Sequence, residues 1–463
     1  MNENKIFLLE TSVEEQNRLE YSPDGTYALG MAYLDSVLQK QGYKVLTKDF
    51  AQFSELECLK RVKIILDQFK PNLVGISMMS MTRVSSFKVI ELIKKQYPGV
   101  KIVLGGVHPT VMYEQLLNNF PIDCVIIGEG ERTLVELLPA LFSNKKLDKI
   151  NGIAFRKNKK IIKTKERELI CDLDSIPFPN HEAFMNPKRK RIALLSSRGC
   201  PNICSFCALY LISRRRYRMR SYQNVVDEIE FLVKKFPQIK EIEFSDDTFT
   251  LSEERVINFC KEIVKRQIHV KFICSARIKP ASEEMFYWME KAGFKEIRFG
   301  IETGSRKMLV SIHKGITIEQ IIETFKIASK FKKIKFVKFL MVGFPGENED
   351  TVKETIELTK KLQKLVPMDF FYATPLWVYP GTEVYEQMKK AKKIDDKFWL
   401  SNKSCPHYTV EHTEEEILNM SNRISFETSL DRGYYYFLIL ILKKMLTNPK
   451  EYTKRMINFV FKR

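Results

Sequence analysis

The sequence lacks any apolar run long enough to cross a membrane. Its longest such run, residues 434–442, has nine residues, whereas a membrane-spanning helix needs about 20. The N-terminal stretch MNENKIFLLE has too short an apolar segment to be a signal peptide. We therefore expect a cytoplasmic protein that contacts membranes, if at all, only at their surface.

Cysteines are few, and their arrangement excludes a disulfide-rich protein. The chain of 463 residues has nine of them, an odd number, spread thinly from position 58 to position 405. That distribution fits a reducing compartment in which some thiols bind metal. The length and a hydrophobic content of 44% indicate a globular protein of roughly two to four domains.

Acidic residues are too few to balance the basic ones, but only in one part of the chain. Residues 1–150 hold 18 basic and 18 acidic side chains, so the whole net charge of +19 lies in residues 151–463. An acidic small molecule, a nucleic acid or an anionic lipid would suit such a surface. A solvated, lysine-rich surface without any partner explains it equally well.

Residues 1–150 alternate between short apolar strands and amphipathic helices. This alternation predicts an α/β domain, a Rossmann-like doubly wound parallel sheet with helices on both faces. Ligands of such sheets bind at the C-terminal ends of the strands, where glycines let the backbone approach. The predicted strands are 5–10, 44–50, 73–79, 101–106 and 123–128, and the predicted helices are 26–42, 55–69, 85–96, 110–118 and 131–142.

The rest of the chain divides into three predicted parts. Residues 151–187 are predicted to be a linker, because residues 172–184 carry two prolines and several turn formers. A second strand–helix series over 188–394 predicts a partial (β/α)6 barrel, since it has too few strands for a closed eight-stranded one. Residues 395–463 are predicted to be a helical extension. The predicted barrel strands are 191–197, 241–245, 271–276, 296–302, 335–343 and 370–376.

The end of the chain is apolar and basic from residue 434 onward. Such a tail would suit peripheral contact with an anionic membrane. A packed pair of C-terminal helices is the alternative.

Three cysteines gather directly after the first predicted barrel strand, in the stretch RGCPNICSFC. Cys200, Cys204 and Cys207 lie where a barrel places its catalytic loops. Structural zinc takes four ligands, and the nearest histidine, His181, precedes the strand. Three thiolates suit a [4Fe–4S] cluster with one iron open to a small molecule. Chance loop cysteines, or a zinc site completed by a distant ligand, are the alternatives.

The spacing CxxxCxΦC, with Phe206 at the aromatic position, resembles the radical S-adenosylmethionine (SAM) superfamily over roughly residues 190–390. The resemblance implies that the open iron of the [4Fe–4S] cluster chelates the amino and carboxylate groups of SAM. One electron from the cluster then cleaves SAM to the 5′-deoxyadenosyl radical. It also implies a reductant of the flavodoxin or ferredoxin type. The run RRRYRMR at 214–220 is a candidate contact for that partner or for an acidic substrate, unless it is simply a solvated loop.

Later motifs lie in order at successive strand ends and support the same resemblance. SDDTF at 245–249 matches the place where the family contacts the SAM amino group, through Asp246 or Asp247. The resemblance also implies that Arg277 pairs with the SAM carboxylate and that Glu302 accepts from the ribose hydroxyls. The implied adenine-binding residues are Phe206, Gly343, Pro345 and Gly346.

The N-terminal domain resembles the cobalamin-binding branch of this superfamily. The stretch SMM at 77–79 and the glycine pair at 105–106 are similar to the small residues that line the slot for the cobalamin nucleotide tail. Residues 21–36 contain no histidine, so the resemblance implies cobalamin without a histidine on cobalt. Axial ligation by His108, its contact with the cofactor's edge, or a turn-capping role are alternatives, as is a relic domain that binds nothing. The implied cobalamin-binding residues are Ser77, Gly105, Gly106, His108, Gly128 and Glu129.

Taken together, the resemblances imply a cobalamin-dependent radical SAM methyltransferase. It would act on an unactivated carbon, or on phosphorus, of a small-molecule, lipid or peptide substrate, since such a carbon has no lone pair with which to attack SAM. A ring-forming or oxidising enzyme with the same cofactors is one alternative. A tRNA methylthiotransferase is another, but its family carries three further N-terminal cysteines, and residues 1–150 hold only Cys58 and Cys124. The third is a non-catalytic cobalamin or iron–sulfur sensor, and no nucleic-acid-reading element is evident.

Overall fold

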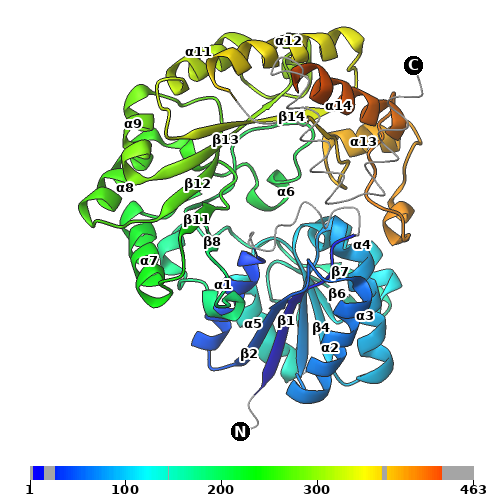
Figure 1. The fold of residues 1–463 in the computed structure, drawn as a ribbon. Helices are drawn as coiled ribbons and strands as arrows, with labels where there is room; N and C mark the ends of the chain where they lie inside the picture. Colours follow the sequence, from blue (N-terminus) through cyan, green and yellow to red (C-terminus); the bar gives the residue numbers. More distant parts are fainter. Residues whose placement is uncertain (1–3, 15–26, 144, 368–372, 430–463) are drawn as a thin grey trace.

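The computed structural model describes residues 4–14, 27–143, 145–367 and 373–429. Two sheets, one from each strand–helix series, organise these residues (Figure 1). No helix in the described ranges is long and apolar enough to cross a membrane. The apolar tail from residue 434 lies outside them.

The first sheet has seven strands in the order β2-β1-β3-β4-β5-β6-β7. The first five are parallel, as the alternation predicts. Helices α1 and α5 pack on one face and α2, α3 and α4 on the other, since the alternating apolar side chains of β1 enter two separate cores. The strands are β1 (Lys5–Glu10), β2 (Lys44–Asp49), β3 (Leu73–Ser77), β4 (Lys101–Gly105) and β5 (Cys124–Ile126); the helices are α1 (Leu29–Lys40), α2 (Glu55–Phe69), α3 (Arg83–Gln96), α4 (Val107–Asn119) and α5 (Glu131–Phe142).

The sheet continues beyond residue 150, into the predicted linker. β6 (Ile153–Lys157) pairs antiparallel with β5, and β7 (Lys160–Lys163) pairs antiparallel with β6. Asn158 and Lys159 form the turn with positive φ values of 49° and 64°, the conformation of a tight two-residue hairpin. The lysines that surround this hairpin hide its strand pattern, so only residues 164–187 have the irregular character expected of a linker.

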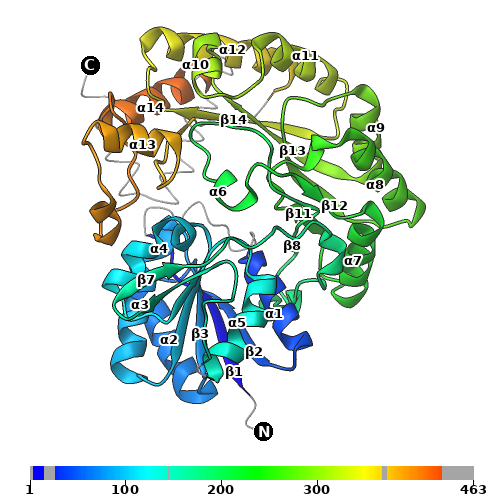
Figure 2. The same ribbon diagram turned by 180° about the vertical axis from the view of Figure 1, so that it is seen from behind.

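The second sheet contains six parallel strands in the order β15-β14-β13-β12-β11-β8. β8 and β15 lie at its two edges, so the barrel is open and the predicted partial (β/α)6 architecture is confirmed. Helices α7, α8, α9, α11 and α12 cover the outer face (Figures 1 and 2). The strands are β8 (Arg191–Leu194), β11 (Glu241–Phe244), β12 (Lys271–Ala276), β13 (Phe294–Glu302), β14 (Lys335–Val342) and β15 (Ala373–Pro375); the helices are α7 (Tyr222–Lys235), α8 (Glu253–Lys265), α9 (Glu283–Ala292), α11 (Ile318–Ala328) and α12 (Glu349–Leu365).

A cluster of phenylalanines holds the outer face of the barrel against its helices. Phe244, Phe272 and Phe294 come from adjacent strands, and Phe259 comes from α8. Their ring centroids lie 5.2–6.3 Å apart, in stacked, tilted and edge-to-face arrangements. This packing fixes the strands whose C-terminal ends carry the predicted SAM motifs.

The predicted helical extension is only partly helical. Helix α14 (Glu414–Ser429) packs on α12, β14 and β15, but residues 401–413 form neither helix nor strand. This segment returns to the first domain, where the buried guanidinium of Arg83 donates to the carbonyl of Lys403 and contacts the Cys405 sulfur at 3.8 Å. The carbonyls of Ser401 and Lys403 accept from that cation rather than from helix amides, and the prediction of a helix is wrong over these residues.

Candidate active site

The three cysteines follow directly after a two-residue strand, β9 (Ser197–Arg198), which pairs with β10 (Arg218–Met219). Cys204 is buried, and Cys200 and Cys207 are half-buried. All three line a cavity of about 230 Å³, which we call the sulfur cavity. Predicted SAM-binding residues line the same cavity: Phe206, Asp247, Arg277 and Glu302.

The chemistry of these thiols fits an iron–sulfur cluster. Burial, together with the negative charge of Cys204 and Cys200, raises the pKa of the Cys207 thiol to about 11. Without a cation, the Cys207 thiol therefore resists becoming a thiolate, and bound iron would supply the missing positive charge. Among the described residues no three His, Cys, Asp or Glu side chains are grouped closely enough to hold a single metal ion. In a cubane each thiolate binds a different iron, so no such grouping is needed.

The two aspartates of SDDTF have different surroundings. Asp246 is buried and accepts from the Ser196 amide at 2.7 Å and from the hydroxyls of Ser196 and Ser197, both at 2.5 Å. Asp247 accepts from the Gly199 amide at 2.8 Å and lines the sulfur cavity. Burial raises the pKa of Asp247 to about 6, and Asp246 adds to the shift. Of the two, Asp247 has the geometry to meet a ligand, whereas Asp246 anchors the loop after β8.

Arg277 and Glu302 both contact Lys314, a residue that the sequence motifs did not include. Lys314 Nζ lies 2.6 Å from Glu302 Oε1, and the Arg277 guanidinium donates to the Lys314 carbonyl. All three residues are buried and line the sulfur cavity. The structure thus brings together the two side chains predicted to bind the carboxylate and the ribose of SAM.

The predicted adenine turn has a structural role in addition to any binding role. A Cβ at Gly343 would lie 2.6 Å from Ile417 of α14, so only glycine allows this helix to approach. The Gly343 amide donates to Glu347 at 2.6 Å. Gly343, Pro345 and Gly346 are not among the residues that line the sulfur cavity. The turn contacts the wall of this cavity through Phe344, whose ring lies 5.4 Å from that of the lining residue Phe206.

A second cavity, of about 380 Å³, opens at the strand ends of the first sheet. We call it the glycine cavity. Five of the six predicted cobalamin-binding residues line it: Ser77, Gly105, Gly106, Gly128 and Glu129. A Cβ at Gly30 or Gly128 would meet nothing within 4 Å, so both glycines border open space. Aliphatic walls from Leu8, Met31, Val103 and Leu134 complete the slot, and this shape and lining fit the nucleotide tail of cobalamin.

The sixth residue, His108, does not line the glycine cavity. Its ring is fully buried, its Nδ1 lies 3.0 Å from Ser80 Oγ, and it packs edge-on against Trp399. Burial and the nearby charge of Arg83 lower its pKa to about 3. His108 is therefore a neutral packed side chain, and the structure gives no support to its proposed contact with cobalt.

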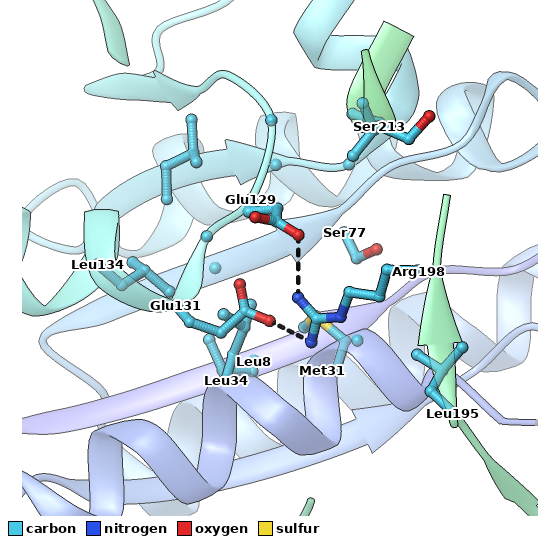
Figure 3. Close-up of a pocket in the computed structure, with 18 of the residues that line it drawn as sticks. Leu8, Met31, Leu34, Ser77, Glu129, Glu131, Leu134, Leu195, Arg198 and Ser213 are labelled. Carbon is cyan, nitrogen blue, oxygen red and sulfur yellow. Dashed lines mark hydrogen bonds and ion pairs between the residues drawn. The ribbon is translucent and has the colours of Figure 1, made fainter. Parts of the chain in front are cut away.

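Ion pairs join the two domains at the wall of the glycine cavity (Figure 3). The guanidinium of Arg198 lies 3.2 Å from Glu129 and 2.7 Å from Glu131, and it faces the Tyr33 ring at 5.0 Å. Arg218 pairs with Glu129 as well, at 2.9 Å. Arg198 stands two residues before the first cysteine, so this cluster ties the cysteine loop to the first domain. The sequence analysis gave no role to Arg198 or Glu131, although Arg198 is the first residue of the stretch RGCPNICSFC.

The arginine run at 214–220 divides into exposed and buried members. Arg215 and Arg216 are exposed, whereas Arg218 and Arg220 are buried. Arg220 pairs with the buried Glu228 at 2.5 Å. The two buried arginines thus stabilise the fold internally, and the two exposed ones are accessible to an acidic partner.

The two cavities share part of their lining. Leu209 and Asp247 belong to both. Leu209 precedes the short helix α6 (Tyr210–Ser213), which lies between the two sheets in both views of the ribbon. The two cavities are therefore adjacent, with Leu209 and Asp247 between them.

Comparison with known families matches two separate parts of the chain. Residues 194–359 match the radical SAM superfamily, and residues 22–138 match the B12 binding domain. An uncharacterized methyltransferase of Pyrococcus horikoshii is 33% identical over 364 residues, which cover 77% of each chain. The anaerobic magnesium-protoporphyrin IX monomethyl ester cyclase of Rubrivivax gelatinosus is 29% identical over 71% of this chain and 61% of the cyclase.

Solved structures with the same fold include two cobalamin-containing radical SAM proteins. The methyltransferase TsrM from Kitasatospora setae, with cobalamin and a [4Fe–4S] cluster bound, has a TM-score of 0.70 over 85% of this chain and 76% of its own, at 18% identity. OxsB, with aqua-cobalamin and SAM bound, has a TM-score of 0.66 over 88% of this chain and 57% of its own, at 22% identity. At these identities the likeness concerns the fold, and it confirms the predicted fold class.

Proposed function

Because this chain belongs to the radical SAM superfamily and carries a B12 binding domain, we propose that it is a cobalamin-dependent methyltransferase. It would cleave SAM reductively and transfer a methyl group to an unactivated carbon, or to phosphorus, of a small-molecule, lipid or peptide substrate. Its cofactors would be a [4Fe–4S] cluster, SAM and cobalamin.

One observation carries this proposal: the sulfur cavity and the glycine cavity meet at Leu209 and Asp247. A radical methylation requires hydrogen abstraction and methyl delivery at one substrate carbon, so both reagents must reach the same point. A sensor that binds either cofactor would have no need of a shared wall.

The residues of this chain divide the work between binding and orientation. Cys200, Cys204 and Cys207 would hold the cluster, and the polar groups at the strand ends would orient SAM. The aliphatic lining of the glycine cavity would exclude water and seat the nucleotide tail. When bound, the cluster would supply the electron that cleaves SAM, and the corrinoid would supply the methyl group.

The proposal can be tested before any substrate is known. Protein reconstituted anaerobically with iron, sulfide and hydroxocobalamin is mixed with SAM and a strong reductant, and the products are separated by mass. A methyltransferase of this type forms 5′-deoxyadenosine by reductive cleavage and S-adenosylhomocysteine by methyl transfer to the corrinoid. Formation of 5′-deoxyadenosine alone would instead favour a ring-forming or oxidising enzyme. Absence of both products would overturn the proposal.

A radical SAM enzyme also needs a reductant and a substrate. We propose a flavodoxin- or ferredoxin-type protein as the reductant. Ile203, between the first two cysteines, is 49% exposed, and the exposed Arg215 and Arg216 follow the same loop. An apolar contact with a basic border suits a small acidic electron carrier.

A further inference from the structure

Lys314 lines the sulfur cavity but belongs to none of the motifs identified in the sequence. Its ammonium lies 2.6 Å from Glu302 Oε1. The two side chains are 7% and 10% exposed, and both line the cavity beside the cysteines. Lys314 is therefore a buried cation directly beside a carboxylate predicted to bind SAM.

The backbone of Glu302 explains why that carboxylate needs to be held. Its φ of 69° lies in the left-handed region, and the pairing of β13 with β14 shifts register between Gly300 and Glu302. A non-glycine residue in this conformation persists only when its surroundings enforce it. The bulge turns Glu302 back over Gly300, where an added Cβ would lie 2.6 Å from Glu302 Oε1 and 3.0 Å from Lys314 Nζ. The absence of a side chain at Gly300 thus makes room for the ion pair.

The backbone of the same lysine also orients a second predicted ligand of SAM. The Lys314 carbonyl accepts from the Arg277 guanidinium. The next residue, Gly315, has a φ of 67°, and a Cβ there would lie 3.9 Å from Arg277 Nη2. One short loop therefore sets the position of both Glu302 and Arg277, which come from different strand ends.

We propose that Lys314 is a positioning residue of the SAM site. Its ammonium holds the Glu302 carboxylate, and its carbonyl holds the Arg277 guanidinium, in the orientation that SAM requires. This inference rests on the proposed function. A role in stability alone explains the pair poorly, because a buried ion pair commonly adds little over a well-packed apolar pair. Orientation of a ligand-binding carboxylate is a better reason for placing two charges in a cavity.

The test compares Lys314→Met with the wild type in SAM cleavage to 5′-deoxyadenosine. We expect the KM for SAM to rise by about tenfold or more, because the buried Glu302 loses its partner. Lys314→Arg keeps the positive charge and should restore most of the affinity. Lys330→Met is the matched control, since Lys330 pairs with Glu283 at 2.5 Å on the surface, with exposed fractions of 57% and 61%. Its KM should equal that of the wild type.

A double variant separates positioning from direct contact. If Lys314 acts through Glu302, Lys314→Met combined with Glu302→Gln should raise the KM no further than Glu302→Gln alone. Additive effects would mean that the ammonium contacts SAM itself, which would overturn the positioning role. An unchanged KM in Lys314→Met would overturn it as well.

Two measurements keep the outcome interpretable. Iron content and the thermal unfolding midpoint show whether each variant holds its cluster and its fold. Should Lys314→Met lose either, Lys314→Gln, which retains a hydrogen-bond donor, takes its place in the same comparison. A wild-type protein that forms no 5′-deoxyadenosine would refute the proposed function. An active wild type whose KM for SAM equals that of Lys314→Met would refute only this inference.

Discussion

The sulfur cavity and the glycine cavity lie at the C-terminal strand ends of two parallel sheets, yet their linings differ in kind. The first is lined by thiols and by buried charges such as Arg277, Glu302 and Lys314. The second is lined by glycines and aliphatic side chains, and its charges lie toward the barrel. A charged ligand of moderate size needs directed polar groups, whereas a bulky nucleotide tail mainly needs room. The same strand-end geometry would thus suit two different ligands through the size and charge of the residues placed there.

The largest effect is expected from a substitution that removes the thiols of the sulfur cavity and leaves the glycine cavity unchanged. Replacing Cys200, Cys204 and Cys207 together by alanine removes all three thiol ligands. We expect loss of iron and of 5′-deoxyadenosine formation to background, measured by metal analysis and by product chromatography. The variant should still retain hydroxocobalamin, since none of the three cysteines lines the glycine cavity. Undiminished SAM cleavage would contradict the assignment of the cluster.

The opposite experiment fills the glycine cavity. Leucine in place of Gly30 projects into space where a Cβ meets nothing within 4 Å, and in helix α1 leucine is also a better helix former than glycine. We expect the affinity for hydroxocobalamin, measured by absorbance after gel filtration, to fall by roughly tenfold to a hundredfold, about 1.4–2.8 kcal/mol. Iron content should not change.

Gly99→Leu provides the control for this substitution. A Cβ at Gly99 also meets nothing, but the residue lies beside Tyr97 and Lys101, away from the glycine cavity. Its corrinoid affinity should match that of the wild type. Equal retention by Gly30→Leu would mean that the corrinoid does not use this slot.

The two regions also differ in how far the sequence predicted them. The parallel strands of both sheets follow from apolar alternation, and the structure contains them, whereas the antiparallel β6–β7 hairpin was missed. The cysteine loop follows from a fixed spacing of thiols, and the structure places all three thiols on one cavity. Pairings between distant residues, such as Arg198 with Glu131 or Lys314 with Glu302, carry no local signal because they depend on how the sheets pack. His108 shows the converse: its position after a strand end suggested a ligand, but tertiary packing buried it against Trp399.

Breaking the contact between the domains should have an intermediate effect. Burial by itself would raise the pKa of Glu131, but Arg198 outweighs it and holds that pKa below its usual range. Arg198→Met leaves this carboxylate buried and unpaired, which should lower the free energy of unfolding by about 3 kcal/mol at neutral pH. Urea denaturation would measure the loss, which should shrink toward acid pH as Glu131 takes up a proton.

A second substitution controls for the lost arginine. Arg198→Met with Glu131→Gln removes both charges of that pair and should recover much of the stability. If the double variant is as unstable as Arg198→Met alone, packing of the arginine side chain, rather than the orphaned carboxylate, causes the loss. Either variant should also retain less hydroxocobalamin, because Arg198 and Glu131 both line the glycine cavity.

The smallest effect on the two cavities is expected from Glu347, a carboxylate that lines neither of them. Burial raises the pKa of Glu347 from its ordinary value of 4.5 to about 7. The folded state therefore binds a proton more tightly than the unfolded state, and its stability falls as pH rises through this window. Glu347→Gln keeps an acceptor for the Gly343 amide and removes the titration. Relative to the variant, the wild type should lose about 2–3 kcal/mol of unfolding free energy between about pH 5 and pH 8. If the urea midpoints of the wild type and of Glu347→Gln instead change with pH in parallel, ionisation of Glu347 does not destabilise the folded state.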